Sequence, residues 1–247
     1  MPDYNRIDPA DVANYRQQFK DHLGQKLYDD LLADLVDRQN RHADIGGADP
    51  VDLLGARIYT EEDSPFLSAG TALDPHHIDP NGNVAGDFRV LNTALRNNDP
   101  ARLAQLDVFL RTTSSSLSHF PEYRGIAFRG VDANFPQSVL ANYTPGAIVT
   151  DRAFTSTAVN PLVPFGFNPQ TLFVVNSRSG RDIGAASKFE FEAEILFRPN
   201  TSFKVLDVVN VRHDADLLGI PGGVPLDATD VRHQVQRVIY LDEVLRA

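Results

Sequence analysis

Residues 191–205 read FEAEILFRPNTSFKV and contain two apolar runs on either side of a turn. The pattern predicts β-strands over 192–197 and 203–211. Successive side chains of a strand alternate between its faces, so Glu192 and Glu194 are expected to point their carboxylates the same way. Two like charges held that close raise the pKa of at least one of them, which is typical of acid–base sites. On its own, a Glu-x-Glu pair more often decorates an exposed strand edge.

Two earlier segments carry polar residues in similar apolar runs. Phe-Arg-Gly-Val ends a predicted strand over 126–131, and its Arg129 has the planar fork that suits bidentate phosphate binding. Gly130 beside it would let a ligand approach the backbone. Phe-Thr-Ser-Thr follows at 154–157 and places Ser156 in another short run. Alternation is expected to turn these polar side chains to the face opposite the packed ones.

The rest of the chain divides into a helical half and a β-rich half. Helical spacing of apolar residues predicts one long or two short helices over 12–41, and further helices over 88–96 and 100–110 with an end within 112–116. Asp8-Pro9 and Asp99-Pro100 are helix-start signals, whereas 45–50 reads as a break and 74–86 as a loop. The remaining strands are expected over 147–150, 171–176 and 235–241.

This order predicts an α+β fold. We expect a single domain over 1–247, with a helical N-terminal lobe over about 1–120 and a β-rich core over about 121–247.

Composition excludes several classes of protein. The net charge of −10 and the lack of a basic cluster argue against nucleic acid as a partner. No apolar run is long enough for membrane insertion, and the polar N-terminus has no Sec signal. Without cysteine the chain has no disulfide, thiolate zinc site or cysteine nucleophile. The histidines at 76 and 77 are interpreted as solvated loop residues, so no metal is expected. Gly222-Gly223 is interpreted as a turn and not a phosphate loop.

The three segments, in this order, resemble the arginine–serine–glutamate class of mono-ADP-ribosyltransferases, of the bacterial toxin or effector type. The similarity is specific over 124–206 and loose over 55–123. It implies an ADP-ribosyltransferase-like fold in which the N-terminal helical lobe packs around two facing, mainly antiparallel β-sheets. It also implies an NAD cleft between the sheets, lined by Arg129, Ser156 and Glu194.

The resemblance further implies a role for each residue. Arg129 would hold a pyrophosphate oxygen of NAD, and Gly130 would meet the nicotinamide amide. Ser156 would orient Glu194, which would bond the nicotinamide ribose and stabilise the oxocarbenium ion. Glu192 would serve the acceptor, most simply an arginine. The residues that would pack beside the nicotinamide are Phe165 or Phe167.

Two departures from the family pattern leave alternatives open. Ala158 stands where a second serine is usual, and 165–170 lacks the arginine that members often carry there. NAD glycohydrolysis without a protein acceptor, or an inactive NAD-binding or partner-binding module, therefore remain alternatives to protein modification. As a toxin or effector, the chain would be secreted or injected and would modify a target protein in the recipient cell's cytosol. Target choice is expected to lie in surface loops such as 176–188.

Overall fold

The computed structural model describes residues 10–60, 88–167, 169–212, 217, 220 and 235–245. The helix start at Asp8-Pro9, the 74–86 loop with its two histidines, and Gly222-Gly223 lie outside these residues. The chain forms two compact units. The first contains residues 1–121, 152–154 and 183–190, and the second contains 122–151, 155–182 and 191–247. The expectation of one domain stays a prediction.

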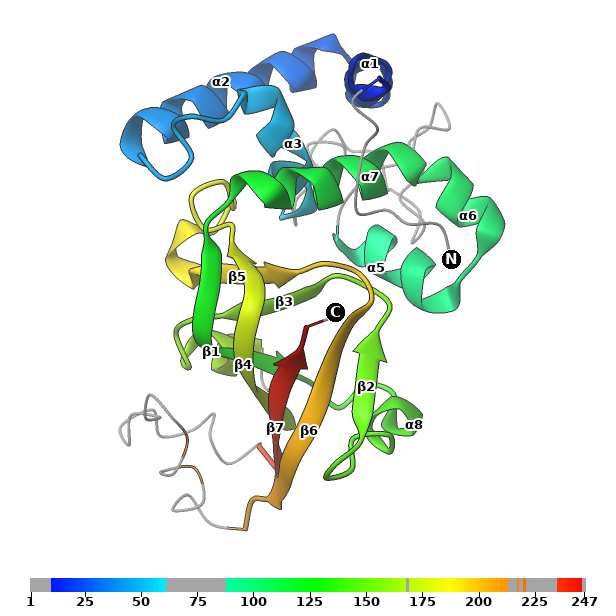
Figure 1. The fold of residues 1–247 in the computed structure, drawn as a ribbon, viewed down its shortest axis with the longest axis vertical. Coiled ribbons are helices and arrows are strands. Elements are labelled where there is room, and N and C mark those ends of the chain that lie inside the picture. The colour runs from blue at the N-terminus through cyan, green and yellow to red at the C-terminus, as the bar shows by residue number, and fades with distance from the viewer. Residues whose placement is uncertain are drawn as a thin grey trace. The chain divides into compact units, whose positions relative to one another are not determined.

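The first unit is built from helices (Figure 1). They are α1 (Val12–Leu23), α2 (Gln25–Arg41), α3 (Pro50–Tyr59), α5 (Phe88–Asn97), α6 (Pro100–Gln105), α7 (Asp107–Ser116) and the short 3-10 helix η1 (Leu117–His119).

Local sequence explains several of the helix boundaries. Gly24 adopts φ 76°, so the 12–41 region forms two helices and not one. The side chain of Asp99 accepts hydrogen bonds from the backbone N–H groups of Ala101 and Arg102, with proline at the first helical position, as the sequence predicts. Asp49 and Pro50 open α3 in the same way, with the Asp49 side chain capping the helix. The expected break in the helical pattern is present between Arg41 and Pro50, but the start of α3 at its end was not predicted.

Helices α3 and α7 approach each other closely at Gly55. A Cβ atom at this position would lie 2.5 Å from the carbonyl carbon and oxygen of Thr112. The hydroxyl of Thr113 donates to the Gly55 carbonyl oxygen at 3.2 Å. The fully buried side chains of this unit include Phe19, Leu35, Leu53, Leu54, Leu91, Leu95, Leu106 and Phe109.

The second unit is built from strands. They are β1 (Glu122–Val131), β2 (Ile148–Asp151), β3 (Thr155–Ala158), β4 (Thr171–Asp182), β5 (Glu194–Phe197), β6 (Thr201–Asn210) and β7 (Arg237–Val244). The short helical segments α8 (Gln137–Leu140), η2 (Val163–Phe167) and η3 (Glu190–Glu192) lie between them in sequence.

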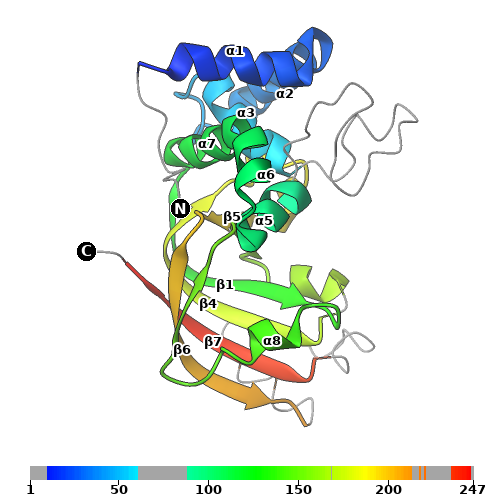
Figure 2. The ribbon, with the colours of Figure 1, turned by 90° about the vertical axis from the view of Figure 1, so that its right-hand side faces the viewer.

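The strands form a five-stranded sheet and a two-stranded ladder. Strands β1, β4, β7, β6 and β2 lie side by side in that order, and only the β4–β7 pair is parallel. Figure 2 shows β1, β4, β7 and β6 stacked in this sheet. Strands β3 and β5 pair with each other, and they join the sheet through Phe128 with Ala158 and through the end of β4. The two expected sheets are therefore linked at their edges into one network of seven strands.

The core of this unit lies between the ladder and the sheet. Ile195 and Phe197 of β5 pack in one buried cluster with Ala127, Phe173, Val205 and Ile239, which come from β1, β4, β6 and β7. A second cluster, with Phe128, Leu172, Val174 and Val238, covers the other face of the sheet. The α+β class with mainly antiparallel strands is confirmed.

Most strand boundaries differ from the expected ones, and two of these differences concern the candidate site. Strand β4 continues to Asp182 and not to Asn176, and much of 183–187 is buried, so 176–188 is not a surface loop. Strand β5 begins at Glu194, which leaves Glu192 outside it. None of the helices in the described part of the chain is long and apolar enough to cross a bilayer.

Candidate active site

Arg129 is attached to the strand that carries Ser156. Alternation along β1 puts Arg129 on the same face as Ala127 and Val131, which belong to the buried cluster. Arg129 thus lies on the face opposite Phe128, as expected, but that face is also packed, because buried clusters cover both sides of β1. Its side chain is half-buried, and Nη1 donates to the Ser156 carbonyl oxygen at 3.0 Å. This bond fixes the guanidinium against β3 and brings the first two predicted residues together.

Ser156 and Glu194 lie on one face of the β3–β5 ladder. Ser156 pairs with Leu196, and Ala158 pairs with Glu194, so the serine and the glutamate are diagonal neighbours. Diagonal neighbours are about 7–8 Å apart, within reach of a long side chain. Glu194 is 6% exposed. The expectation that Ser156 and Glu194 come together is consistent with this register.

Glu192 does not share a strand face with Glu194, contrary to the sequence analysis. It ends the short helix η3, and Ala193 between the two glutamates has φ 45°, in the left-handed region. A non-glycine residue in that conformation turns the chain out of extended geometry. The two carboxylates therefore start from different backbone directions, and strand alternation no longer relates them.

Gly130 is needed for close packing of protein against protein. A Cβ atom there would lie 2.8 Å from Cβ of Pro169 and 2.9 Å from the carbonyl oxygen of Pro164. The segment around η2 thus lies directly against β1. Phe165 in that segment is 5% exposed and packs with Phe128 in the second cluster. Phe167 ends η2, and its side chain lies outside what the structure describes.

The residues just before Ser156 fold with the helical unit. The amide side chain of Asn92, which is buried on α5, accepts from the Phe154 backbone N–H at 3.0 Å and donates to the Tyr59 hydroxyl at 3.0 Å. The Phe154 ring packs edge-on against the Tyr59 ring. Phe154 is therefore held within the helical unit by a buried amide, a role of Asn92 that was not predicted because its partners are distant in sequence.

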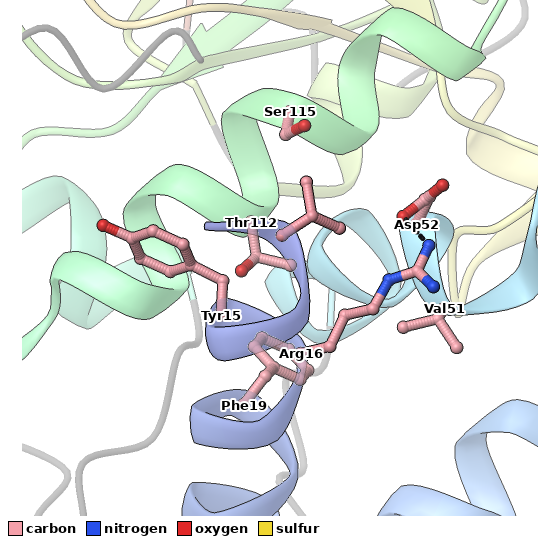
Figure 3. Close-up of a pocket in the computed structure, with 8 residues that line it drawn as sticks. Tyr15, Arg16, Phe19, Val51, Asp52, Thr112 and Ser115 are labelled. Atoms are coloured by element: carbon pink, nitrogen blue, oxygen red, sulfur yellow. Dashed lines mark hydrogen bonds and ion pairs between the residues drawn. The ribbon is translucent and has the colours of Figure 1, made fainter. Parts of the chain in front are cut away.

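A hollow in the helical unit offers a second candidate site (Figure 3). It is lined by Val12, Tyr15, Arg16, Phe19, Val51, Asp52, Thr112 and Ser115. Its arginine already bonds two carboxylates, with Arg16 Nη2 at 2.7 Å from Asp52 and at 3.0 Å from Asp49. This neutralised cation does not suit phosphate, so we do not assign the NAD site here.

Among the residues that the structure describes, no three histidine, aspartate or glutamate side chains lie close enough together to hold a metal ion.

Comparison with known proteins identifies a family. A family model described as NAD:arginine ADP-ribosyltransferase matches residues 93–218, just over half of the chain. The NAD(+)–protein-arginine ADP-ribosyltransferase Tre1 of Serratia proteamaculans is 30% identical over 131 residues, which cover 53% of this chain and 28% of Tre1. The chain spans less than half the length of the curated relatives it matches.

Two solved structures share the fold. The type III effector XopAI from Xanthomonas axonopodis pv. citri matches with a TM-score of 0.61 at 19% identity, covering 98% of this chain and 85% of XopAI. The ADP-ribosyltransferase HopU1 of Pseudomonas syringae matches with a TM-score of 0.59 at 17% identity, covering 87% of each chain. At these identities the likeness concerns the fold.

Proposed function

The chain belongs to the NAD:arginine ADP-ribosyltransferase family, and we propose on that basis that it transfers ADP-ribose from NAD to an arginine of a target protein. One observation supports the proposal most directly. Inside the matched region, Arg129 is bonded to the backbone of Ser156, and Ser156 is the diagonal neighbour of a buried Glu194. An arginine for phosphate, a hydroxyl and a buried carboxylate are thus linked through adjoining strands.

The first chemical step is cleavage of NAD. The bond between ribose C1′ and the nicotinamide nitrogen breaks, its electron pair stays on nitrogen, and neutral nicotinamide leaves without a proton donor. C1′ then carries positive charge, which a carboxylate in a water-poor site stabilises strongly. We assign this role to Glu194, oriented by Ser156, and we assign the grip on the pyrophosphate to Arg129.

The second step needs a group that activates the acceptor. A guanidinium has a pKa above about 12 and is a poor nucleophile until it loses a proton. We assign Glu192 to accept that proton as the arginine nitrogen bonds to C1′. The left-handed Ala193 supports separate roles for the glutamates, because it takes the Glu192 backbone out of the strand that begins at Glu194. Strained residues of this kind cluster at functional sites.

NAD hydrolysis is the second candidate activity. Water can take the place of the acceptor arginine at C1′, and the same Glu194 would stabilise the same cation. Ala158, directly across from Glu194, supplies no hydroxyl to that carboxylate, which is the observation behind the third possibility of an inactive module.

One assay distinguishes the three activities. The chain is incubated with a cell lysate and NAD labelled in its adenylate half, and both protein-bound label and free nicotinamide are followed. We expect label on protein together with nicotinamide release. Nicotinamide without labelled protein would support hydrolysis, and neither product would support the inactive module and overturn the proposal.

We further propose that the enzyme is a toxin or effector that is secreted or injected and acts on a protein in the recipient cell's cytosol. The support is the kind of protein to which it is similar, such as Tre1. Wild type and Glu194→Gln are expressed in bacterial and in eukaryotic cells. Growth arrest by wild type alone, in one of the hosts, is the expected result, whereas unaffected growth in both would contradict this context.

A further inference from the structure

Arg38 holds the segment that leads to the two glutamates. It lies on α2, is 7% exposed, and its Nη1 donates to the Ser187 carbonyl oxygen at 2.8 Å and to the Ala185 carbonyl oxygen at 3.5 Å. The same nitrogen is 2.8 Å from Oε1 of Glu190. A buried arginine thus binds three residues of one short segment, which lie about 150 positions away in the sequence.

Arg38 is itself fixed from the other side. Its Nε donates to Oδ2 of Asp34 at 2.9 Å, and Nε of Arg57 on α3 donates to the same oxygen at 2.8 Å. Arg57 is as buried as Arg38. Because charge-assisted bonds of this kind are directional, the carboxylate between the two arginines leaves Arg38 little freedom to turn.

The segment has further attachments to the helical unit. The Lys188 backbone N–H donates to the Thr60 hydroxyl at 3.0 Å, and that hydroxyl donates to the Arg57 carbonyl oxygen at 2.9 Å. Ile183, Ala186 and Ser187 are fully buried. The segment is therefore anchored along its length up to Glu190, and Glu192 follows two residues later.

The two glutamates depend on this anchor to different degrees. Glu194 is the first residue of β5 and is held by its ladder with β3. Glu192 lies in η3, before the left-handed Ala193 and outside any strand pairing. Glu192 ends the short helix η3, whose first residue, Glu190, is held by Arg38, and the Ala193 carbonyl oxygen just after it accepts from the Val159 N–H at 3.2 Å. Arg38 therefore fixes the chain on the N-terminal side of Glu192.

We propose that Arg38 is a positioning residue that sets the placement of Glu192 and, with it, the efficiency of transfer relative to NAD hydrolysis. The inference rests on the proposed function. It goes beyond the family pattern, because Arg38, Asp34 and Arg57 all lie outside the matched residues 93–218.

The test compares Arg38→Gln and Arg38→Lys with a control on the same helix. Arg41 is 3.2 Å from the same Glu190 carboxylate but is about half exposed, and its ion pairs within the described residues are with the side chains of Asp37 and Glu190. Exposed ion pairs contribute little, so Arg41→Gln is expected to match wild type. The rates of transfer to protein and of nicotinamide release are measured for each variant at a temperature where all are folded.

We expect Arg38→Gln to lower the transfer rate by about tenfold or more and nicotinamide release by less than about threefold, since small displacements of a reacting group cost up to about a hundredfold. Arg38→Lys keeps the charge but cannot replace the planar fork of arginine. Its transfer rate should therefore lie between the rates of wild type and Arg38→Gln. Hydrogen exchange should rise in 184–192 for Arg38→Gln and remain unchanged for Arg41→Gln.

Equal loss of both activities in Arg38→Gln would overturn the inference, because loosened packing alone affects both. Unchanged exchange in 184–192 would overturn it as well. An inactive wild type would be a different outcome, in which the proposed function itself fails.

Discussion

Ala158 lies directly opposite Glu194 in the ladder between β3 and β5. Directly paired residues have Cβ atoms about 4.5–5.5 Å apart, so the size and polarity of residue 158 act on the Glu194 carboxylate. Ala158 is 5% exposed, which leaves little space for a larger side chain. We expect Ala158→Val to lower nicotinamide release by about tenfold, because it displaces a buried catalytic group. Ala158→Ser, which adds one hydroxyl that can donate to the carboxylate, should retain or increase the wild-type rate. An equal loss of nicotinamide release in Ala158→Val and Ala158→Ser would show that residue 158 acts through strand stability and not through Glu194.

Gly130 gives a prediction about NAD binding. An alanine Cβ there would overlap Pro164 and Pro169, so Gly130→Ala must push the segment around η2 away from β1. If that segment adjoins the nicotinamide, KM for NAD should rise by about tenfold. Gly166 lies in the same segment with nothing within 4 Å of its Cβ position, so Gly166→Ala is the matched control and should bind NAD like wild type. Unchanged KM in Gly130→Ala would remove this segment from the NAD site.

The helix crossing at Gly55 gives a prediction about stability. Gly55→Ala must separate α3 from α7, because its Cβ would lie 2.5 Å from backbone atoms that cannot rotate away. Overpacking costs about 1–3 kcal/mol, and a backbone clash belongs at the upper end of that range. Gly47→Ala adds a Cβ in open space and should be close to neutral. Chemical denaturation of the two variants measures the difference, and similar stabilities would contradict the close crossing.

The carboxylates around Arg38 predict how stability depends on pH. Burial raises the pKa of Asp34, but hydrogen bonds from Arg57 and Arg38 outweigh it, and the net pKa is lowered. Glu190 behaves in the same way, with burial opposed by the charges of Arg38 and Arg41 and a lowered net pKa. A carboxyl whose pKa is lower in the folded state stabilises the fold above its unfolded pKa of about 4, and this contribution is lost as pH falls through the folded value.

Asp34→Asn should therefore be less stable than wild type near neutral pH, and the difference should shrink in acid below about pH 4. Thermal unfolding of both proteins across pH 3–7 measures this. A difference in stability between wild type and Asp34→Asn that is constant over the whole pH range would mean that Asp34 contributes through packing and not through its charge.

Much of the fold follows from patterns that are local in sequence. Asp99-Pro100 predicts a helix start because cap and proline act on the next three residues, and the structure confirms it. Asp49-Pro50 carries the same signal, but it was interpreted only as part of the break over 45–50. The strands were found by alternation, with errors of a few residues at their ends.

What sequence could not predict depends on contacts between distant residues or on unusual backbone. Nothing in the local sequence distinguishes Arg38 from Arg41, the other arginine of α2, since the partners that matter lie at 185–190. Residue 193 is an alanine and not a glycine, so nothing in the sequence indicated its left-handed conformation. The alternation pattern therefore wrongly predicted that β5 begins at Glu192. The packing of both faces of β1 was also not predicted, because the residues that cover the face of Ala127 and Val131 come from other strands.

The central claim is that Glu194 cleaves NAD and Glu192 delivers ADP-ribose to an arginine. The most direct test is to measure nicotinamide release and mass-spectrometric attachment of ADP-ribose to arginine for wild type, Glu194→Gln and Glu192→Gln. Wild type should modify arginine, Glu194→Gln should lose both activities by about a hundredfold or more, and Glu192→Gln should lose attachment while largely retaining release. Attachment to residues other than arginine, or equal loss of both activities in the two variants, would contradict the account.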